Sequence, residues 1–435
     1  MDYIDTFYSR TLTASGEKPR LEGLHEADCC IIGGGLAGLS TAFHLAEAGK
    51  SVILLEENRL GWGASGRNGG FVSPGYAHGR SAIAGMVGQA HADDLHRLSI
   101  EGMQLVRRHI ALLGISHADP QHGIMSVVRY DTGESLRRDA DIMSERFDYP
   151  LAFMDTSQVR EVLRSQRYFQ ALRDDQAFHF HPLNYVHGLA GAVEKAGGEI
   201  FEQSCAVSYE RKGASTLIKT AHGEVRVRDL VIATGGYTGS LSSRMQRAYL
   251  PIATYVMLSE SNPALIEQAI RTRHAVGDNR RAGDYYRLVD EGKRILWGGR
   301  ITTRAADTKA LTRELRAEMT STFPQLTDLK VELAWSGMMS YARHRMPQIG
   351  SLGDNVWYCT AFGGHGMNTT AIGGKVVAEA ILGEPERLRL FAPFGLSWAG
   401  GAAGLAVAQA TFWKLQMQDK WQEWRSQRGG MRKWS

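Results

Sequence analysis

The chain has 435 residues, of which 43% are hydrophobic and 22% charged, and this composition excludes an intrinsically disordered or fibrous protein. A length of this order predicts two domains, or three. The formal net charge of +4 gives no case for a nucleic-acid-binding protein. The four cysteines have neither C-x-x-C nor zinc-ligand spacing, so we expect no metal site.

The N-terminal segment carries no secretion signal that we can identify. Its first 27 residues are polar and mixed, without the apolar run of a signal peptide. We therefore expect a cytoplasmic protein with reduced cysteines.

Residues 28–56 predict a strand, a tight glycine turn, a helix and a second strand. The apolar run C-C-I-I leads directly into the pattern G-x-G-x-x-G. Gly33 allows a sharp turn, Gly35 lets the backbone approach a pyrophosphate, and Gly38 lets the helix pack close to the strand. The helix N-terminus offers unpaired N–H groups to the phosphates. Glu56 follows about 20 residues later, where a carboxylate accepts hydrogen bonds from a ribose. This motif predicts a dinucleotide site.

A second glycine-rich loop, G-W-G-A-S-G-R-N-G-G, covers residues 61–70. Enzymes that use NAD do not usually need a loop at this place. Because glycines leave room for main-chain N–H donors, the loop can run along a pyrophosphate and reach an isoalloxazine ring. It favours FAD over NAD, and the alternative is a flexible surface loop.

The central part of the chain alternates between helical and strand-like patterns. Residues 93–172 are predicted to be largely helical, because apolar residues such as Ile100, Met103 and Val106 recur at three- and four-residue steps. The other predicted elements are a helix over 189–197, strands over 199–201, 229–234 and 254–258, a hairpin of 285–288 with 295–297, and a helix over 309–322.

A third glycine turn, A-F-G-G-H-G-M-N-T-T, covers residues 361–370. It follows a predicted strand over 355–361 and opens a predicted helix over 370–382. A helix N-terminus aimed at the pyrimidine edge of a flavin stabilises the negative charge that develops there on reduction. Asn368 or Thr369 can serve as N-cap or as a donor to the ring. His365 is either a proton carrier or a packing residue.

These three elements, in this order and spacing, resemble those of the D-amino-acid-oxidase-like FAD-dependent oxidoreductases, and most closely the γ-glutamylputrescine oxidoreductase branch. The resemblance covers residues 21–382 and includes the loop at 61–70, the stretch D-Y-Y-R-L at 284–288, and R-x-P-Q-I-G at 345–350. It implies an α/β fold: a Rossmann-type FAD-binding domain with a central parallel sheet, and an α+β substrate domain whose large, mostly antiparallel sheet covers the flavin.

The order of the predicted elements along the chain suggests a cofactor domain made of three separated stretches, with two insertions that build a second domain. An FAD-binding domain is expected from residues 1–92, 174–250 and 331–394, a substrate-binding domain from 93–173 and 251–330, and a C-terminal helical tail from 395–435. The expected FAD-binding residues are Gly33, Gly35, Leu36, Ala37, Gly38, Glu56, Glu57, Gly63, Ala64, Ser65, Gly66, Asn68, Gly69, Gly70, Val207, Thr234, Gly235, Gly364, Gly366, Met367, Asn368 and Thr369.

The sequence departs from the resembling family in two ways. Monomeric sarcosine oxidases attach FAD through a cysteine at the segment that corresponds to residues 337–341, and this chain has none there. We therefore expect non-covalent FAD. Those enzymes also place lysines beside the flavin, whereas this chain has Asn368 at one of these positions and Leu296 or Trp297 at the other. The lost charges put rapid reaction with oxygen in doubt.

The resemblance implies oxidation of a C–N bond in a small amine, or an amino-acid derivative, to an imine that water hydrolyses. We expect hydride transfer to the flavin from the carbon beside an unprotonated amine, with oxygen or an electron carrier as acceptor. The candidate catalytic residues are Tyr286, Arg287, Arg343 and His365. For Arg287 and Arg343 the alternative is a solvated surface charge.

The C-terminal tail suggests a second interpretation, a flavin dehydrogenase that passes electrons from a secondary amine or imino acid to a membrane quinone. From residue 412 onward, basic residues outnumber acidic ones by six to two. They accompany aromatic and apolar residues in a composition suited to an interfacial helix at the inner face of a membrane. These residues are Trp398, Leu405, Phe412, Trp413, Trp421 and Trp424. The alternative is a helix docked on the protein's own surface. A flavin enzyme that modifies RNA is a third reading, which the balance of charges outside the tail disfavours.

Overall fold

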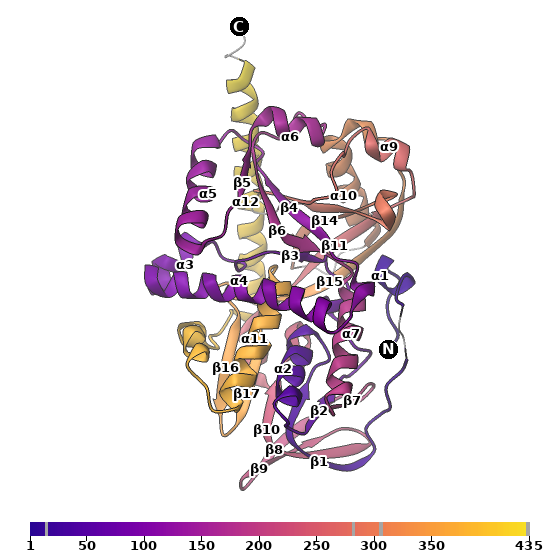
Figure 1. Cartoon of the computed structure of the whole chain (residues 1–435), viewed down its shortest axis with the longest axis vertical. Helices are drawn as coiled ribbons and strands as arrows, with labels where there is room; N and C mark the ends of the chain where they lie inside the picture. The colour runs from indigo at the N-terminus through magenta and orange to yellow at the C-terminus, as the bar shows by residue number, and fades with distance from the viewer. Residues whose placement is uncertain (14–15, 281–282, 304–307, 432–435) are drawn as a thin grey trace. The chain divides into compact units, whose positions relative to one another are not determined.

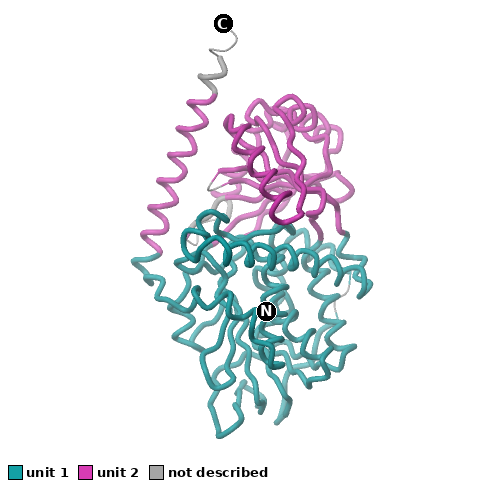
Figure 2. The backbone as a smooth tube through the Cα atoms, turned by 60° about the vertical axis from the view of Figure 1, so that its left-hand side comes forward, with its two compact units in different colours: residues 1–119, 181–252, 337–404 teal, residues 120–180, 253–336, 405–435 magenta. Residues whose placement is uncertain are grey.

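The computed structural model describes residues 1–13, 16–280, 283–303 and 308–431. The chain forms two compact units (Figure 2). Unit 1 comprises residues 1–119, 181–252 and 337–404, and unit 2 comprises residues 120–180, 253–336 and 405–435.

Unit 1 is built on a sheet whose central five strands run parallel (Figure 1). An antiparallel strand forms one edge, and a two-stranded extension continues from β10. In sheet order the strands are β16 Gln348–Gly353, β17 Val356–Thr360, β10 Gly223–Ile232, β1 Gly23–Ile32, β2 Val52–Leu55 and β7 Glu199–Phe201, with β9 Ser215–Lys219 and β8 Ser208–Lys212 as the extension. The buried runs at the ends of β1, β2 and β10 are those of a parallel sheet covered on both faces. The predicted Rossmann-type sheet is confirmed.

The helices of unit 1 pack closely where glycine or small residues meet. A Cβ added at Gly374 of α11 would lie 2.8 Å from the carbonyl oxygen of Ala37 in α2. The Ser40 hydroxyl donates to the carbonyl of Ala371 at 2.7 Å, which ties the same two helices together. The short strand β3 Phe71–Val72 also belongs to this unit, and its helices are α1 Phe7–Arg10, α2 Leu36–Glu47, α3 Arg80–Val87, α4 Gln89–Leu112, α7 Pro182–Lys195, α8 Ser243–Gln246 and α11 Gly366–Ile381.

Unit 2 contains a mostly antiparallel sheet, as the resemblance implies. Only the pairing of β12 with β4 is parallel among the pairings described for this unit. In order the strands are β15 Val331–Ala342, β11 Tyr249–Ser259, β14 Arg294–Thr302, β13 Tyr285–Val289, β12 Ala275–Asp278, β4 Gln121–Val127 and β6 Ala171–His179, and β5 Ala152–Met154 also pairs with β6. The helices are α5 Gly133–Phe147, α6 Thr156–Val162, α9 Pro263–Glu267, α10 Thr308–Thr322 and most of α12 Gly401–Met431.

The units depart from the expected boundaries in two main places. Residues 93–119 belong to unit 1, because α4 packs against α11 there: a Cβ at Gly102 would lie only 2.4 Å from the carbonyl oxygen of Asn368. The C-terminal tail is divided, with residues 395–404 in unit 1 and the rest in unit 2. No helix in the described part of the chain is long and apolar enough to span a bilayer.

Within residues 93–172, predicted to be largely helical, α4, α5 and α6 are helices, but β4, β5 and the start of β6 are strands. Gly114 adopts a positive φ of 66° just after α4, a conformation that ends a helix. Strand β4 then pairs with β12, about 150 residues further along the chain. The other predicted helices and strands have counterparts, and the hairpin of β13 and β14 turns at Glu291 and Gly292, both with positive φ.

Candidate functional site

The glycine turn between β1 and α2 has the geometry that its sequence predicts. Gly33 has a φ of +114°, and a Cβ there would lie 2.6 Å from the carbonyl oxygen of Ala233. A Cβ at Gly38 would lie 2.0 Å from the carbonyl oxygen of Gly33, so the helix touches the strand where only glycine fits. Both glycines are therefore required by close backbone packing.

The N-terminus of α2 is covered by the second glycine-rich loop. Gly35 is the N-cap and offers no side-chain acceptor. The Leu36 N–H donates instead to Ser65 Oγ at 3.0 Å, and Gly61 N–H donates to the carbonyl of Gly34 at 2.9 Å. The loop at 61–70 thus lies against the end of a helix whose first-turn N–H groups favour an anion.

Glu56 holds a carboxylate at the carboxyl end of β2, beside the same turn. Its two oxygens accept hydrogen bonds from the backbone N–H groups of Gly34, at 2.7 Å, and Asn58, at 2.8 Å. Burial raises the pKa of Glu56 to about 7 despite these two donors. A carboxylate at this position is the acceptor that the ribose of a dinucleotide requires. The neighbouring Glu57 is exposed.

The loop at 61–70 has a defined internal structure, which does not support the flexible-loop alternative. Ala64–Gly66 form a 3-10 turn. Asn68 Nδ2 donates to the carbonyls of Ala64 and Ser65, each at 3.0 Å, and its Oδ1 accepts from Gly70 N–H at 2.8 Å. The Arg67 guanidinium lies 4.6 Å from the centre of the Trp62 ring. Asn68 therefore stabilises the loop from within.

The third glycine turn leads into α11 through His365, which is the N-cap. The predicted N-cap roles of Asn368 and Thr369 are wrong, because α11 begins at Gly366. Asn368 is 1% exposed and its Nδ2 donates to the carbonyls of Gly75 and Ser99, each at 3.2 Å. Thr369 Oγ1 donates to the carbonyl of His365 within the helix. The first-turn backbone N–H groups of α11, which begins at Gly366, have no partner within the helix and can serve a ligand.

His365 is held as a neutral side chain. Its Nε2 lies 3.0 Å from the carbonyl oxygens of both Ser73 and Pro74, so the proton resides on Nε2. Burial lowers its pKa from the ordinary histidine value. This bracing favours the packing role over that of a proton carrier.

The remaining expected cofactor residues lie around the ends of β10 and β7. Thr234 Oγ1 shares a hydrogen bond with Thr238 at 2.7 Å. Gly235 has a φ of +56° and its carbonyl accepts from Thr360 Oγ1 at 3.2 Å, which links the ends of β10 and β17. A Cβ at Gly63 would lie 3.0 Å from the Tyr237 ring. The Val207 side chain is 55% exposed and its backbone N–H is already bonded to the carbonyl of Lys219.

Unit 1 therefore brings most of the expected cofactor residues together at the carboxyl edge of its parallel sheet. The positions where a Cβ cannot be accommodated, the helix N-terminus of α2 and the carboxylate of Glu56 all fit a dinucleotide. The 61–70 loop lies against the same turn through Ser65 and Gly61. Gly69, Gly70, Ala64 and Gly364 belong to the same loops.

Two of the candidate catalytic residues lie in unit 2, on opposite faces of one strand. Tyr286 is 1% exposed and stacks on Trp297 in the core, with ring centres 4.4 Å apart. Arg287 points to the other face of the sheet, as adjacent strand residues must. Tyr286 and Arg287 cannot both face a substrate, and the structure assigns Tyr286 to the core. Tyr285 shares the face of Arg287. It was not among the residues expected to face the substrate, although the alternation of side chains along residues 284–288 places it there.

Arg287 is buried and its guanidinium is fixed by two groups of β6 and the residue after it. One nitrogen donates to the carbonyl of Phe180 at 2.9 Å, and another lies 3.3 Å from His179 Nδ1. His179 Nε2 donates to the carbonyl of Arg273 at 3.0 Å, which leaves Nδ1 as an acceptor for Arg287. Burial, and then the charge of Arg287, lowers the pKa of His179 to about 3, so this histidine is neutral.

Arg343 belongs to unit 1 and is exposed. It has no hydrogen bond or ion pair with any other residue that the structure describes, which matches the solvated-charge alternative. Of the two residues considered for the second lysine position, Trp297 lies in the core and Leu296 on the face of Arg287. Leu296 is fully buried.

The described residues contain no group of three or more His, Cys, Asp or Glu side chains arranged to hold a metal ion.

A family model described as FAD dependent oxidoreductase (DAO) matches residues 28–380. Over 394 residues the chain is 32% identical to gamma-glutamylputrescine oxidoreductase of Escherichia coli strain K12, covering 90% of this chain and 92% of that protein.

Solved structures show the same fold at lower identity. Glycine oxidase from Geobacillus kaustophilus aligns with a TM-score of 0.70 at 17% identity, covering 86% of this chain and 99% of that one. L-proline dehydrogenase from P. horikoshii also gives 0.70 at 17% identity, covering 85% and 96%. This chain belongs to the DAO family of FAD-dependent oxidoreductases.

Proposed function

We propose that this enzyme oxidises the C–N bond of a small amine of the γ-glutamylputrescine type to an imine. The observation that carries the proposal is the 32% identity to gamma-glutamylputrescine oxidoreductase over nearly the full length of both chains. Bound FAD supplies the hydride acceptor, and the amine must be unprotonated because only a free lone pair can assist loss of the hydride.

Within this proposal unit 1 binds FAD and unit 2 binds substrate. The glycine turn, Glu56 and the 61–70 loop hold the dinucleotide part of FAD. Arg287 offers a fixed positive charge for the carboxylate of an amino-acid-derived substrate. Its guanidinium is oriented by Phe180 and His179, so little side-chain entropy is lost on binding.

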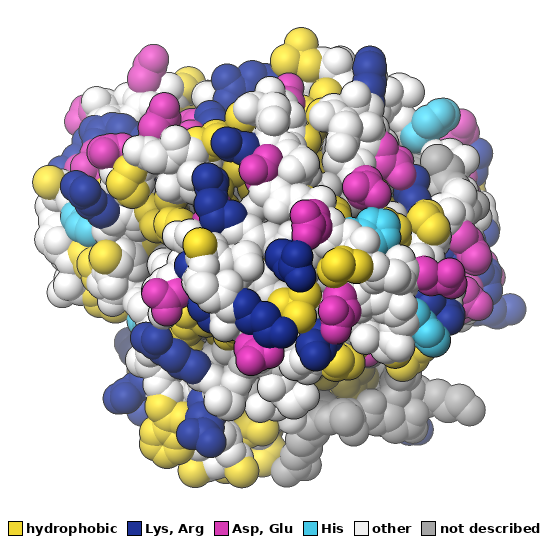
Figure 3. All heavy atoms as spheres, turned by 90° about the horizontal axis from the view of Figure 1, so that it is seen from below, with side chains coloured by type: hydrophobic (Ala, Val, Ile, Leu, Met, Phe, Trp, Pro, Cys, Tyr) yellow, Lys and Arg dark blue, Asp and Glu magenta, His cyan; other side chains and the backbone are white. Residues whose placement is uncertain are grey.

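The second candidate is a dehydrogenase that passes electrons to a membrane quinone rather than to oxygen. It is favoured by the absence of lysine at the two family positions, where Asn368 is tied to backbone carbonyls and Leu296 is buried. An RNA-modifying enzyme is not favoured, since basic and acidic side chains are interspersed across the centre of the face in Figure 3.

Anaerobic mixing tests the substrate class. Purified yellow enzyme is mixed with γ-glutamylated diamines, free polyamines, cyclic imino acids, N-methyl amino acids and primary amines. The visible absorbance of the oxidised flavin, which is lost on reduction, is followed. We expect bleaching by a γ-glutamylated diamine first. Bleaching by a cyclic imino acid alone would instead support the second candidate. No bleaching by any amine would overturn both.

Re-admitting air then identifies the acceptor. Rapid recovery of the yellow colour with hydrogen peroxide formation indicates an oxidase. Slow recovery that a soluble quinone analogue accelerates indicates a dehydrogenase.

A further inference from the structure

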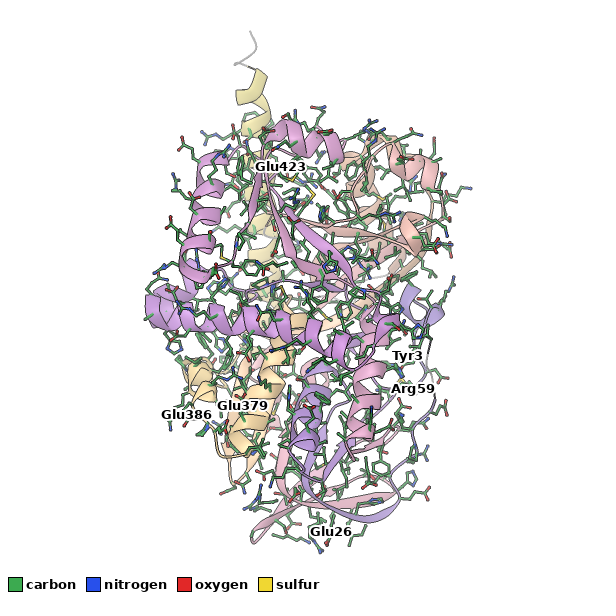
Figure 4. All side chains as sticks on the ribbon, in the orientation of Figure 1. Tyr3, Glu26, Arg59, Glu379, Glu386 and Glu423 are labelled. Carbon is green, nitrogen blue, oxygen red and sulfur yellow. The ribbon has the colours of Figure 1, made fainter. Side chains whose placement is uncertain are left out.

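The C-terminal helix α12 is attached to unit 2 through its polar side. Glu423, labelled in Figure 4, lies 3.6 Å from Arg167 and 3.9 Å from Arg280, and its side chain is 12% exposed. Asp419 on the same side is 3% exposed. Gln409 accepts a hydrogen bond from the backbone N–H of Thr303 at 3.1 Å. The acidic side chains of this helix therefore face the protein.

Four large apolar side chains of α12 are exposed. Trp413, Met417, Trp421 and Trp424 follow one another at steps of four, four and three residues, which places them on one stripe of a helix. Their exposed fractions are 49%, 66%, 55% and 49%. We call these four residues the aromatic face. A soluble helix normally buries its large apolar side chains, whereas α12 exposes these four, and an exposed apolar patch of this kind marks an interaction surface.

The exposed charged side chains described on α12 have one sign. Lys414, Lys420 and Arg425 are exposed, and no acidic side chain of α12 is exposed among the side chains described up to residue 426. The Arg425 guanidinium lies 4.6 Å from the centre of the Trp421 ring. The surface therefore combines apolar aromatic area with positive charge.

We propose that the aromatic face of α12 binds the surface of a bilayer that contains anionic phospholipid. Tryptophan side chains are suited to the boundary between headgroups and acyl chains, where a ring can be half-buried. Basic residues beside them are attracted to anionic headgroups. The charges disfavour a second copy as occupant, because a symmetric contact would oppose the cations of one helix to those of the other. This surface is separate from the amine chemistry proposed above.

Co-sedimentation of the full-length FAD-loaded enzyme with vesicles tests the proposal. Binding is measured to phosphatidylcholine vesicles with and without about one third phosphatidylglycerol, an anionic fraction large enough to create a surface potential. Each measurement is made at low and at high salt. We expect binding to the anionic vesicles that weakens with salt, accompanied by a blue shift of tryptophan emission. Because binding needs no turnover, this result does not depend on the substrate.

Two variants and one control separate the contributions. Trp421→Ser with Trp424→Ser is expected to reduce vesicle binding at least about tenfold, since it removes the apolar part of the contact. Lys414→Gln, Lys420→Gln and Arg425→Gln together should reduce it by roughly fivefold per charge removed. The control Leu112→Ser changes a leucine that is 81% exposed on α4 and should bind like wild type.

Thermal unfolding and FAD content should stay close to those of the wild type in all three proteins, because each substituted side chain is exposed on its helix. Absent or salt-independent binding of the wild type, or equal binding by the tryptophan variant, overturns the proposal. A wild-type dimer in sedimentation velocity that becomes monomeric in the tryptophan variant would overturn it in favour of a second copy.

Discussion

Substitution of Gly38 by alanine is the most direct test of the cofactor cradle. A Cβ at this position would lie 2.0 Å from the carbonyl oxygen of Gly33, whereas Cβ atoms essentially never approach another atom within 3.0 Å. Helix α2 must therefore move away from β1 by at least 1.0 Å. Neither atom belongs to a flexible side chain, so the strain falls on the backbone of the glycine turn.

The magnitude follows from two opposing terms. Overpacking of this kind costs about 1–3 kcal/mol, while alanine in a helix gains about 1 kcal/mol over glycine. The net loss of unfolding free energy is up to about 2 kcal/mol. A displaced helix N-terminus also weakens its contacts with the pyrophosphate, and a loss of about 1.4 kcal/mol there lowers FAD affinity tenfold.

The assay compares Gly38→Ala with Gly191→Ala. Gly191 lies in α7, is exposed, and has no atom within 4 Å of an added Cβ, so alanine there should stabilise the protein by up to about 1 kcal/mol. FAD retained after gel filtration and thermal unfolding with and without added FAD are measured. If Gly38→Ala keeps its FAD and is stabilised like the control, the close approach of α2 to the turn is not what the structure indicates.

Three further outcomes are expected. Burial raises the pKa of Glu56 to about 7, and a ribose requires the ionised carboxylate, so FAD binding below that pH must release a proton. The affinity for FAD should therefore rise with pH up to about 7 and then level off. The variant Glu56→Gln should bind FAD more weakly and without this pH dependence, as fluorescence titration can check. Arg287→Ala should lower kcat/KM by about 10–100-fold through loss of a charge-assisted contact, while Tyr286→Phe, at a core position, should change it little; the reverse ranking in steady-state kinetics would contradict the assignment of faces. Acid precipitation of the enzyme should release all flavin into the supernatant, since residues 337–341 contain no cysteine, and a yellow pellet would show covalent attachment.

The local glycine motifs were predictable because their chemistry is local. The turn at Gly33, the close packing at Gly38 and the position of Glu56 depend on residues within one strand–turn–helix–strand unit, whose spacing is fixed by backbone geometry. The hairpin of β13 and β14 was also predictable, since its strands are close in sequence.

Other features depend on partners that are distant along the chain. Strand β4 was predicted as helix because its pairing partner β12 lies about 150 residues away. Asn368 was expected to cap α11 or to donate to the flavin ring, but it donates to the carbonyls of Gly75 and Ser99, which lie 293 and 269 residues earlier in the sequence. The role of His365 was likewise decided by Ser73 and Pro74.

By itself the sequence determined the family, the cofactor class and the basic character of the C-terminal tail, because glycine spacing and side-chain charge are properties of the chain in any conformation. The tertiary structure decided which face each of these residues occupies. Tyr286 went to the core and Arg287 to the opposite face, while Glu423 of α12 turned toward Arg167 and Arg280 and the tryptophans of the aromatic face are exposed. The physical reason is that burial and ion pairing join residues far apart in the sequence, and their energies depend on the folded arrangement rather than on spacing.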